Sequence, residues 1–137
     1  MSYGFIRGKR ILAVCANEIK NTSDNKVADL QSWNVLYCET FEELFEHARA
    51  GLLDAVALQT NPHDQNCPRK LLNLYEYQKN GRPILVSYSA SNPDWFENLV
   101  YISGANIHLK HEPSQDELIQ ALEDHLQGNS LAHASGE

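Results

Sequence analysis

The chain has 137 residues, enough for one domain that buries roughly two-thirds of the surface its unfolded form exposes. Its formal net charge of −7 argues against a nucleic-acid surface, which needs clustered lysine and arginine. No apolar run approaches the roughly 20 residues that span a bilayer, and the one behind the basic start is too short for a signal peptide. With three cysteines in no paired spacing, these features predict a cytoplasmic protein with reduced thiols and no nucleic-acid or membrane partner.

The first half of the chain alternates short apolar runs with helical patterns. An unbroken apolar run is typical of a parallel strand that is covered on both faces. Thr40 and Glu43 have the spacing of a capping box, in which hydroxyl and carboxylate satisfy free backbone amides at a helix start. The predicted elements are a strand over 11–16, a helix over 23–33, a strand over 35–38, a helix from 41 to the Gly51 that ends it, and a strand over 53–58.

The second half continues the alternation to the end of the chain. Ser114 and Glu117 repeat the capping box ahead of the last helix. The predicted elements are a helix that starts near Pro68 and ends at Asn80-Gly81, a strand from 84, a helix from Asn92-Pro93 to Gly104, a strand over 107–109, and the last helix. From Gly128 on the residues are small and polar, which predicts one domain over 1–127 and a frayed, flexible tail over 128–137.

Five strand–helix units with short connections predict one parallel sheet with helices on both faces, because such crossovers are right-handed. No internal repeat or linker divides the chain. In folds of this kind ligands bind at the carboxyl ends of the strands, near the switch in strand order. We therefore expect any chemistry in the loops after strands one, three, four and five.

Several motifs of the later half occur in a consistent order. Val86-Ser-Tyr-Ser-Ala90 closes the fourth predicted strand, Gly104-Ala105 precedes the fifth, and Lys110 with Pro113 leads into the last helix. From Arg10 to Leu126 this order and spacing resemble the response-regulator receiver family. The resemblance implies a doubly wound, flavodoxin-like α/β fold, with a five-stranded parallel sheet in the order 2-1-3-4-5 and helices on both faces.

The receiver family transfers a phosphoryl group to an aspartate at the end of strand three, with magnesium held by acidic residues after strand one. Gln59 stands at the acceptor position, and a carboxamide cannot form an acyl phosphate. The positions that match this degenerate phosphorylation pocket are Ala16, Asn17, Glu18, Gln59, Ser89 and Lys110. The resemblance therefore implies a pseudo-receiver that is not an enzyme and uses no metal or cofactor.

Two positions of the degenerate pocket also have simpler explanations. Ser89 matches the family's Ser/Thr that responds to the phosphoryl group, and it also suits a strand-end hydroxyl that bonds nearby backbone. Lys110 matches the family's lysine, but two residues separate it from Pro113, so a surface lysine is the alternative.

In the receiver family the fourth helix, fifth strand and fifth helix bind partners and form dimers. Trp95, Tyr101 and His108 fall on the matching elements, and exposed aromatic side chains give contact area at low entropy cost. The resemblance implies a two-component signalling module that acts through protein–protein contacts on this candidate interaction face, with a homodimer as one option. The alternative for Trp95 is packing on its own sheet.

Cys15 is the basis of a second functional hypothesis. Its place at the end of the first strand resembles that of the phosphocysteine in sugar-transport phosphocarrier domains, which implies a thiol-based phosphoryl carrier. A phosphate-binding loop needs glycines, whereas residues 16–21 contain none and add an acidic residue. A small buried cysteine is the simpler alternative.

Two further possibilities concern metals and context. His63, Asp64 and Cys67 lie in one loop, but their spacing fits no standard zinc pattern, so we predict no metal site there. A third hypothesis is that the chain is a module of a larger kinase or transcription regulator.

Overall fold

The computed structural model describes residues 10–15, 27–30 and 33–135. Its elements are β1 (Arg10–Cys15), β2 (Val27–Leu30), β3 (Trp33–Cys38), α1 (Phe41–Arg49), β4 (Ala55–Gln59), α2 (Cys67–Tyr75), β5 (Ile84–Tyr88), α3 (Asp94–Ile102), β6 (Ile107–Leu109) and α4 (Gln115–Ser135). In this part of the chain no helix is both long enough and apolar enough to cross a bilayer.

The strands form one sheet in the order β2-β3-β1-β4-β5-β6. Five of these strands, β3, β1, β4, β5 and β6, pair in parallel. When they are numbered by their order along the chain, leaving out β2, their order in the sheet is 2-1-3-4-5. The predicted doubly wound α/β fold is therefore confirmed. Strand β2 adds an antiparallel edge strand next to β3, which the sequence analysis did not predict.

The helix predicted over 23–33 is wrong where the structure describes that segment. Val27–Leu30 is strand β2, and Trp33 begins β3. Two apolar residues three apart in so short a run do not separate helix from strand, and pairing with β3 decides the outcome. Trp33 is fully buried, and its indole N–H donates to the Glu123 carboxylate at 2.9 Å. Residues 23–26 and 31–32 lie outside the described residues.

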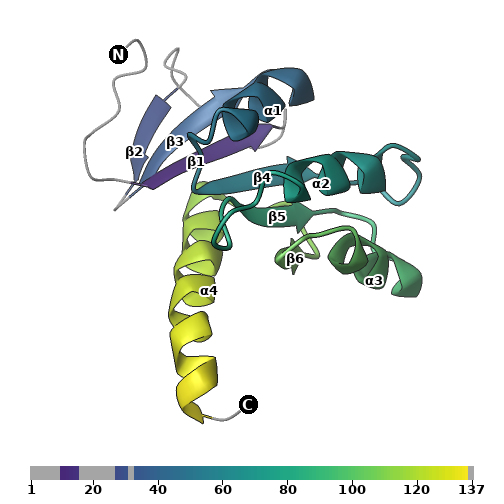
Figure 1. Cartoon of the computed structure of the whole chain (residues 1–137). Helices are drawn as coiled ribbons and strands as arrows, with labels where there is room; N and C mark the ends of the chain where they lie inside the picture. The colour runs from purple at the N-terminus through teal and green to yellow at the C-terminus, as the bar shows by residue number, and fades with distance from the viewer. Residues whose placement is uncertain (1–9, 16–26, 31–32, 136–137) are drawn as a thin grey trace.

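Helices cover both faces of the sheet, but unequally (Figure 1). The fully buried helix residues on the first face are Leu44 of α1, Leu71 and Leu74 of α2, and Phe96 of α3. On the other face, α4 is the helix among the described elements that packs on the sheet, through Leu118, Ile119 and Leu122. Each such side chain contributes about 1.5–3 kcal/mol by leaving water.

Local signals place most helix ends where the sequence predicts them. The Ser114 box is complete, because Ser114 N–H donates to Glu117 Oε1 at 2.8 Å and Glu117 N–H donates to Ser114 Oγ at 3.1 Å. At α1, Thr40 Oγ1 accepts from Glu43 N–H, but the Glu43 carboxylate accepts from Glu39 N–H. Helix α4 is longer than predicted, since it continues through Gly128 to Ser135. One glycine costs a helix only about 1 kcal/mol relative to alanine.

Candidate functional site

A row of hydrogen-bonded polar side chains crosses the ends of β4, β5 and β6. Thr60 Oγ1 lies 2.7 Å from Ser87 Oγ, and Ser87 Oγ lies 2.9 Å from His108 Nδ1. His108 Nε2 lies 2.7 Å from Asn92 Oδ1 in the loop that precedes α3. Ser87 and His108 are register partners on β5 and β6, so the row runs across the strands. Thr60, Ser87 and His108 are all buried, and we call these four residues the polar row.

The hydrogen bonds of Asn92 determine the direction of the polar row. Asn92 Nδ2 donates to the carbonyl oxygens of Ser89 at 2.8 Å and Lys110 at 3.2 Å, so its Oδ1 faces His108 as an acceptor. His108 Nε2 must then carry a proton, and in the neutral ring Nδ1 accepts from the Ser87 hydroxyl. Every polar atom that joins the row is satisfied when His108 is neutral.

The row also has an acceptor for a reversed arrangement. Thr60 Oγ1 lies 3.1 Å from the Tyr88 carbonyl oxygen as well as close to Ser87. A protonated His108 would donate to Ser87 Oγ, the Ser87 hydroxyl would donate to Thr60 Oγ1, and the Thr60 hydroxyl would donate to that carbonyl. Burial nevertheless lowers the pKa of His108 from its ordinary value of 6.5. The smaller effects are those of Glu97, which raises the pKa, and Lys110, which lowers it.

His108 was predicted to lie on the exposed interaction face, and this prediction is wrong, because only 7% of the residue is exposed. Strand β6 alternates, so Ile107 and Leu109 point to the α4 side while His108 points toward α3. Its ring meets Phe96 edge-on at 5.7 Å between centroids, and the backbone N–H of His108 donates to the Tyr101 hydroxyl. His108 therefore joins β6 to α3 from inside.

The residue types of the polar row resemble a nucleophilic triad, but their placement does not suit catalysis. Ser87 Oγ would have to reach a substrate, and Ser87 is fully buried between its neighbours. Sequence reasoning missed the row. The row could have been suspected from the polar residues Ser87 and His108, because they stand inside otherwise apolar predicted strands.

The structure distributes the described positions of the degenerate pocket over different surroundings. Gln59 ends β4 with its side chain exposed. Ser89 is buried, and its hydroxyl donates to the carbonyl of Ser91 and accepts from the N–H of the same residue. Residues 16–18, which hold the other three positions, lie outside the described residues.

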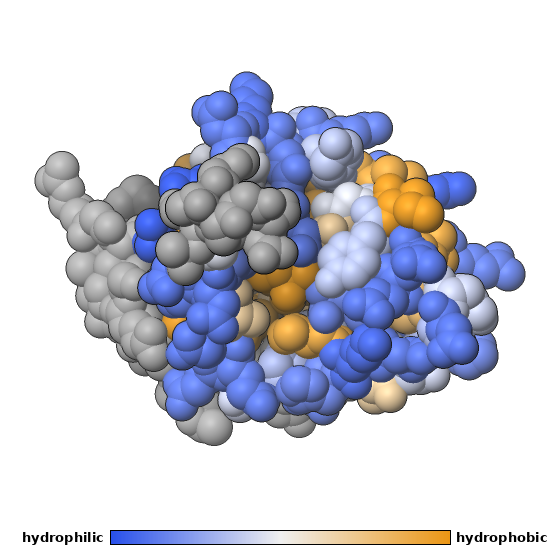
Figure 2. All heavy atoms as spheres, turned by 90° about the horizontal axis from the view of Figure 1, so that it is seen from below, coloured by the Kyte–Doolittle hydropathy of each residue, from blue (hydrophilic) through white to orange (hydrophobic). Residues whose placement is uncertain are grey.

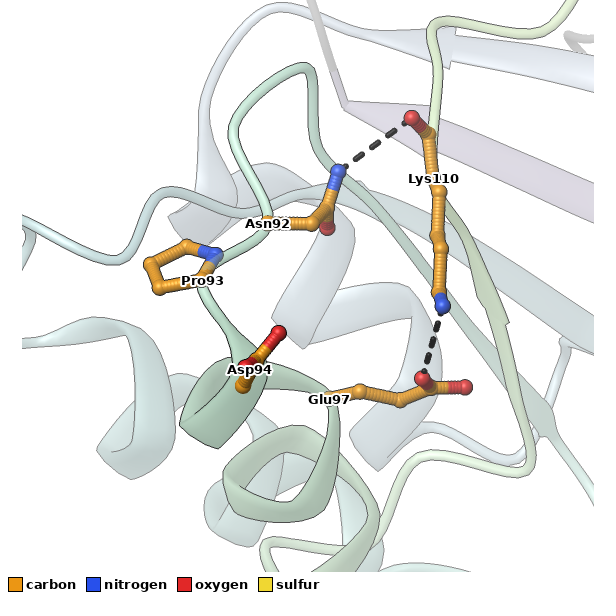
Figure 3. A pocket seen from close by; sticks show the side chains of 5 residues that line it. All are labelled: Asn92, Pro93, Asp94, Glu97 and Lys110. Carbon is orange, nitrogen blue, oxygen red and sulfur yellow. Dashed lines mark hydrogen bonds and ion pairs between the residues drawn. The ribbon is translucent and has the colours of Figure 1, made fainter.

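Lys110 lines a shallow hollow of about 90 Å³ with Asn92, Pro93, Asp94 and Glu97 (Figure 3). Its Nζ forms an ion pair with Glu97 Oε1 at 3.1 Å, and the side chains of Lys110 and Glu97 are 63% and 38% exposed. The lysine is therefore held along α3. An exposed ion pair of this kind contributes at most about 1 kcal/mol, so it orients Lys110 only weakly.

A second hollow, of about 200 Å³, opens at the carboxyl ends of β1 and β4. It is lined by Cys15, Glu39, Thr40, Phe41, Leu58, Gln59 and Lys70. The strand order switches beside β1, so this hollow lies where parallel α/β folds bind ligands. Burial raises the pKa of the Cys15 thiol, more than Lys70 lowers it. A raised thiol pKa reduces the thiolate that a phosphoryl carrier would need.

Helix α3 presents large side chains to solvent. Trp95 is 55% exposed and Tyr101 is 42% exposed, as the candidate interaction face requires. Ile102 is 79% exposed and was missed by the sequence analysis, although it lies seven residues from Trp95 and hence on the same side of the helix. Figure 2 shows that apolar surface of the molecule occurs in patches surrounded by hydrophilic side chains.

Among the described residues, three metal-binding side chains come together at one place, beside the end of β3. Cys38, Glu43 and His47 have ligand atoms within 4.8 Å of one another. The loop that carries His63 and Asp64 forms no such group among the described residues.

No protein-family model matches this chain, and no curated protein matches its sequence.

Proposed function

We propose that this chain is a pseudo-receiver, a regulatory module of signal transduction that acts through protein contacts and is not phosphorylated. The observation that carries the proposal is Gln59 at the carboxyl end of β4, beside the switch in strand order. The receiver family has its acceptor aspartate at that position. An amide side chain is neutral and is no nucleophile toward a phosphodonor, so the chemistry of the family is lost there.

The surroundings of the two other described pocket positions support the same proposal. Ser89 Oγ is used within its own turn, and Lys110 Nζ is paired with Glu97 on α3. A receiver that responds to phosphorylation needs both groups directed at the phosphoryl oxygens. Because Gln59 offers no phosphate acceptor and the Ser89 hydroxyl is used within its own turn, any switching of this domain comes from a partner that binds two conformations with different affinity.

The contact surface of the proposed module is the exposed side of α3. Trp95 and Ile102 supply apolar area, and Phe96 and His108 beneath them hold the helix on the sheet. Exposed tryptophan is common among the residues that dominate binding energy. The partner is a protein, with a second copy of the chain as the alternative. Because none of the three cysteines, all of them among the described residues, forms a disulfide, we place the module in the reducing cytoplasm.

Intact mass tests the loss of phosphorylation. The protein is incubated with magnesium and a small-molecule phosphodonor, and its mass is expected to stay unchanged. Stoichiometric phosphate on a carboxylate near β4 would contradict the pseudo-receiver. Phosphate on Cys15, lost in Cys15→Ser, would instead establish the thiol-based phosphoryl carrier.

Partner capture tests the contact surface. Trp95→Ala is expected to reduce recovery of the partner at least about tenfold, because truncated interface hot spots cost 2 kcal/mol or more. Leu72→Ala is the matched control, since Leu72 is an exposed apolar residue on α2. Equal recovery with both variants would remove α3 from the interface. Sedimentation of the free chain shows whether a second copy is the partner.

A further inference from the structure

Three metal-binding side chains of different chemistry meet above the end of β3. Cys38 is the last residue of that strand and is only 4% exposed. Glu43 and His47 belong to α1 and are half-buried. The thiol sulfur, a carboxylate oxygen and an imidazole nitrogen all lie within 4.8 Å of one another.

The local fold brings these residues together. Only two residues separate Cys38 from α1, and Thr40 caps the helix, so its first turns begin directly beside the strand end. Glu43 and His47 are four residues apart and therefore occupy the same side of the helix. Their neighbours Leu44 and Ala48 are buried, which places the Glu43–His47 side at the margin of the helix face that packs on the sheet.

This donor set selects among metal ions. Thiolate, imidazole and carboxylate are the three donor types that zinc uses, whereas magnesium and calcium require oxygen ligands throughout. In a tetrahedral zinc site, bond lengths of about 2.0–2.3 Å place neighbouring donor atoms about 3.3–3.6 Å apart. Donor atoms up to 4.8 Å apart would have to approach by at most about 1.5 Å, and we expect rotation of the two half-buried α1 side chains to allow this.

We propose that Cys38, Glu43 and His47 bind one zinc ion, with a fourth position open to water. The site is independent of the proposed pseudo-receiver function, because none of the three residues belongs to the degenerate pocket or to α3. Three protein ligands with one open position is the arrangement of zinc sites that bind an exchangeable fourth ligand. The half-buried Glu43 and His47 leave the group accessible from solvent.

Cys15 is a second thiol near the proposed site, and we expect that it is not an essential zinc ligand. It is the register partner of Cys38 on β1, and both residues belong to the same core cluster. The group of mutually close donor atoms nevertheless holds Cys38 and not Cys15. Substituting each cysteine in turn therefore distinguishes a zinc site with Cys38 as its one thiolate ligand from a site that uses the thiolates of both Cys15 and Cys38.

The test is metal titration of the full, untagged, metal-free chain. Cobalt(II) is expected to bind at one equivalent, with a thiolate-to-metal charge-transfer band and the visible bands of tetrahedral cobalt, and zinc is expected to displace it. Cys38→Ser should abolish the charge-transfer band. His47→Gln should weaken zinc binding more than about 100-fold, since even outer-shell partners of a metal cost about 10–100-fold. Glu43→Gln, which keeps an acceptor for the α1 cap, should weaken it at least about tenfold.

Two matched controls complete the test. Cys15→Ser and Cys67→Ser each remove a free thiol outside the ligand set and should change zinc affinity less than about threefold. Circular dichroism confirms that each variant is folded. Absence of a charge-transfer band at one equivalent of cobalt would overturn the proposal, as would loss of binding in Cys15→Ser equal to that in Cys38→Ser. The phosphodonor experiment is unaffected by either result.

Discussion

The polar row makes a graded prediction about stability. In His108→Ala, two hydrogen bonds and the edge-on contact with Phe96 are lost from a buried position. Each hydrogen bond contributes about 0.5–1.5 kcal/mol, and the void adds a packing cost. We expect a loss of about 2–4 kcal/mol in the free energy of unfolding, a large part of the 5–15 kcal/mol that is typical of a domain.

The two hydroxyl variants should cost less, and in a defined order. Ser87→Ala leaves His108 Nδ1 buried without its hydrogen-bond donor, which costs about 1–3 kcal/mol. Thr60→Val is nearly isosteric and leaves the contact between Ser87 and His108 intact. The Tyr88 carbonyl also keeps the Thr60 backbone N–H, so we expect only about 0.5–1.5 kcal/mol.

Urea unfolding followed by tryptophan fluorescence measures all three variants. Trp33 is fully buried and Trp95 is exposed, so the change in signal reports mainly on the core around Trp33. An unchanged slope of the transition would show that the variants alter stability and not the surface exposed on unfolding. The reasoning is refuted if Thr60→Val costs as much as Ser87→Ala, or if His108→Ala leaves the midpoint unchanged.

Four further predictions concern the pH dependence of stability, two glycines and one helix cap. Burial lowers the native pKa values of His108 and His125 from 6.5, so the unfolded chain binds more protons in acid. The free energy of unfolding should therefore be highest above pH 6.5 and should fall as the pH drops through the native pKa values. A urea midpoint that increases as the pH is lowered would contradict this. Gly104→Ala should destabilise by about 1–3 kcal/mol, because φ is +117° and the new Cβ would lie 2.7 Å from Cβ of Tyr75 at the end of α2. Gly128→Ala, in open space on α4, should stabilise by about 0.5–1 kcal/mol, and thermal unfolding should give the two shifts opposite signs. Ser114→Ala should cost about 1 kcal/mol by removing the α4 cap, and an unchanged melting temperature would refute the role of that hydroxyl.

Features that depend on neighbours in the chain could be read from the sequence. The caps at Thr40 and Ser114 start α1 and α4 as predicted, and the strand over 107–109 has the predicted bounds. Gly51 has φ of +77° just past the end of α1, a conformation that glycine adopts without strain. Interactions of this kind span only a few residues, so their chemistry is visible in the order of the amino acids.

Two segments were misread. The segment before Trp33 has a weak helical pattern, yet Val27–Leu30 pairs with β3 as an edge strand. Gly128 was taken as a boundary, yet α4 continues through it. For Val27–Leu30 the local preference is weak, and pairing with β3 outweighs it. For Gly128 the cost of one glycine in a helix is only about 1 kcal/mol, which is too little to end α4.

For this protein, the sequence by itself determined the alternation of strands and helices, the parallel sheet and the placement of Gln59 at the end of a central strand. Only the tertiary structure decided that His108 turns inward to Ser87 and Asn92, and that Cys38 meets Glu43 and His47. The alternation of elements and the parallel direction of the strands follow from apolar runs and short connections, which are properties of the chain, whereas the order 2-1-3-4-5 was implied only by the resemblance to the receiver family. The side-chain groups depend on which strand neighbours which, on the register, and on the side of each helix that faces the sheet, and these exist only once the chain has folded.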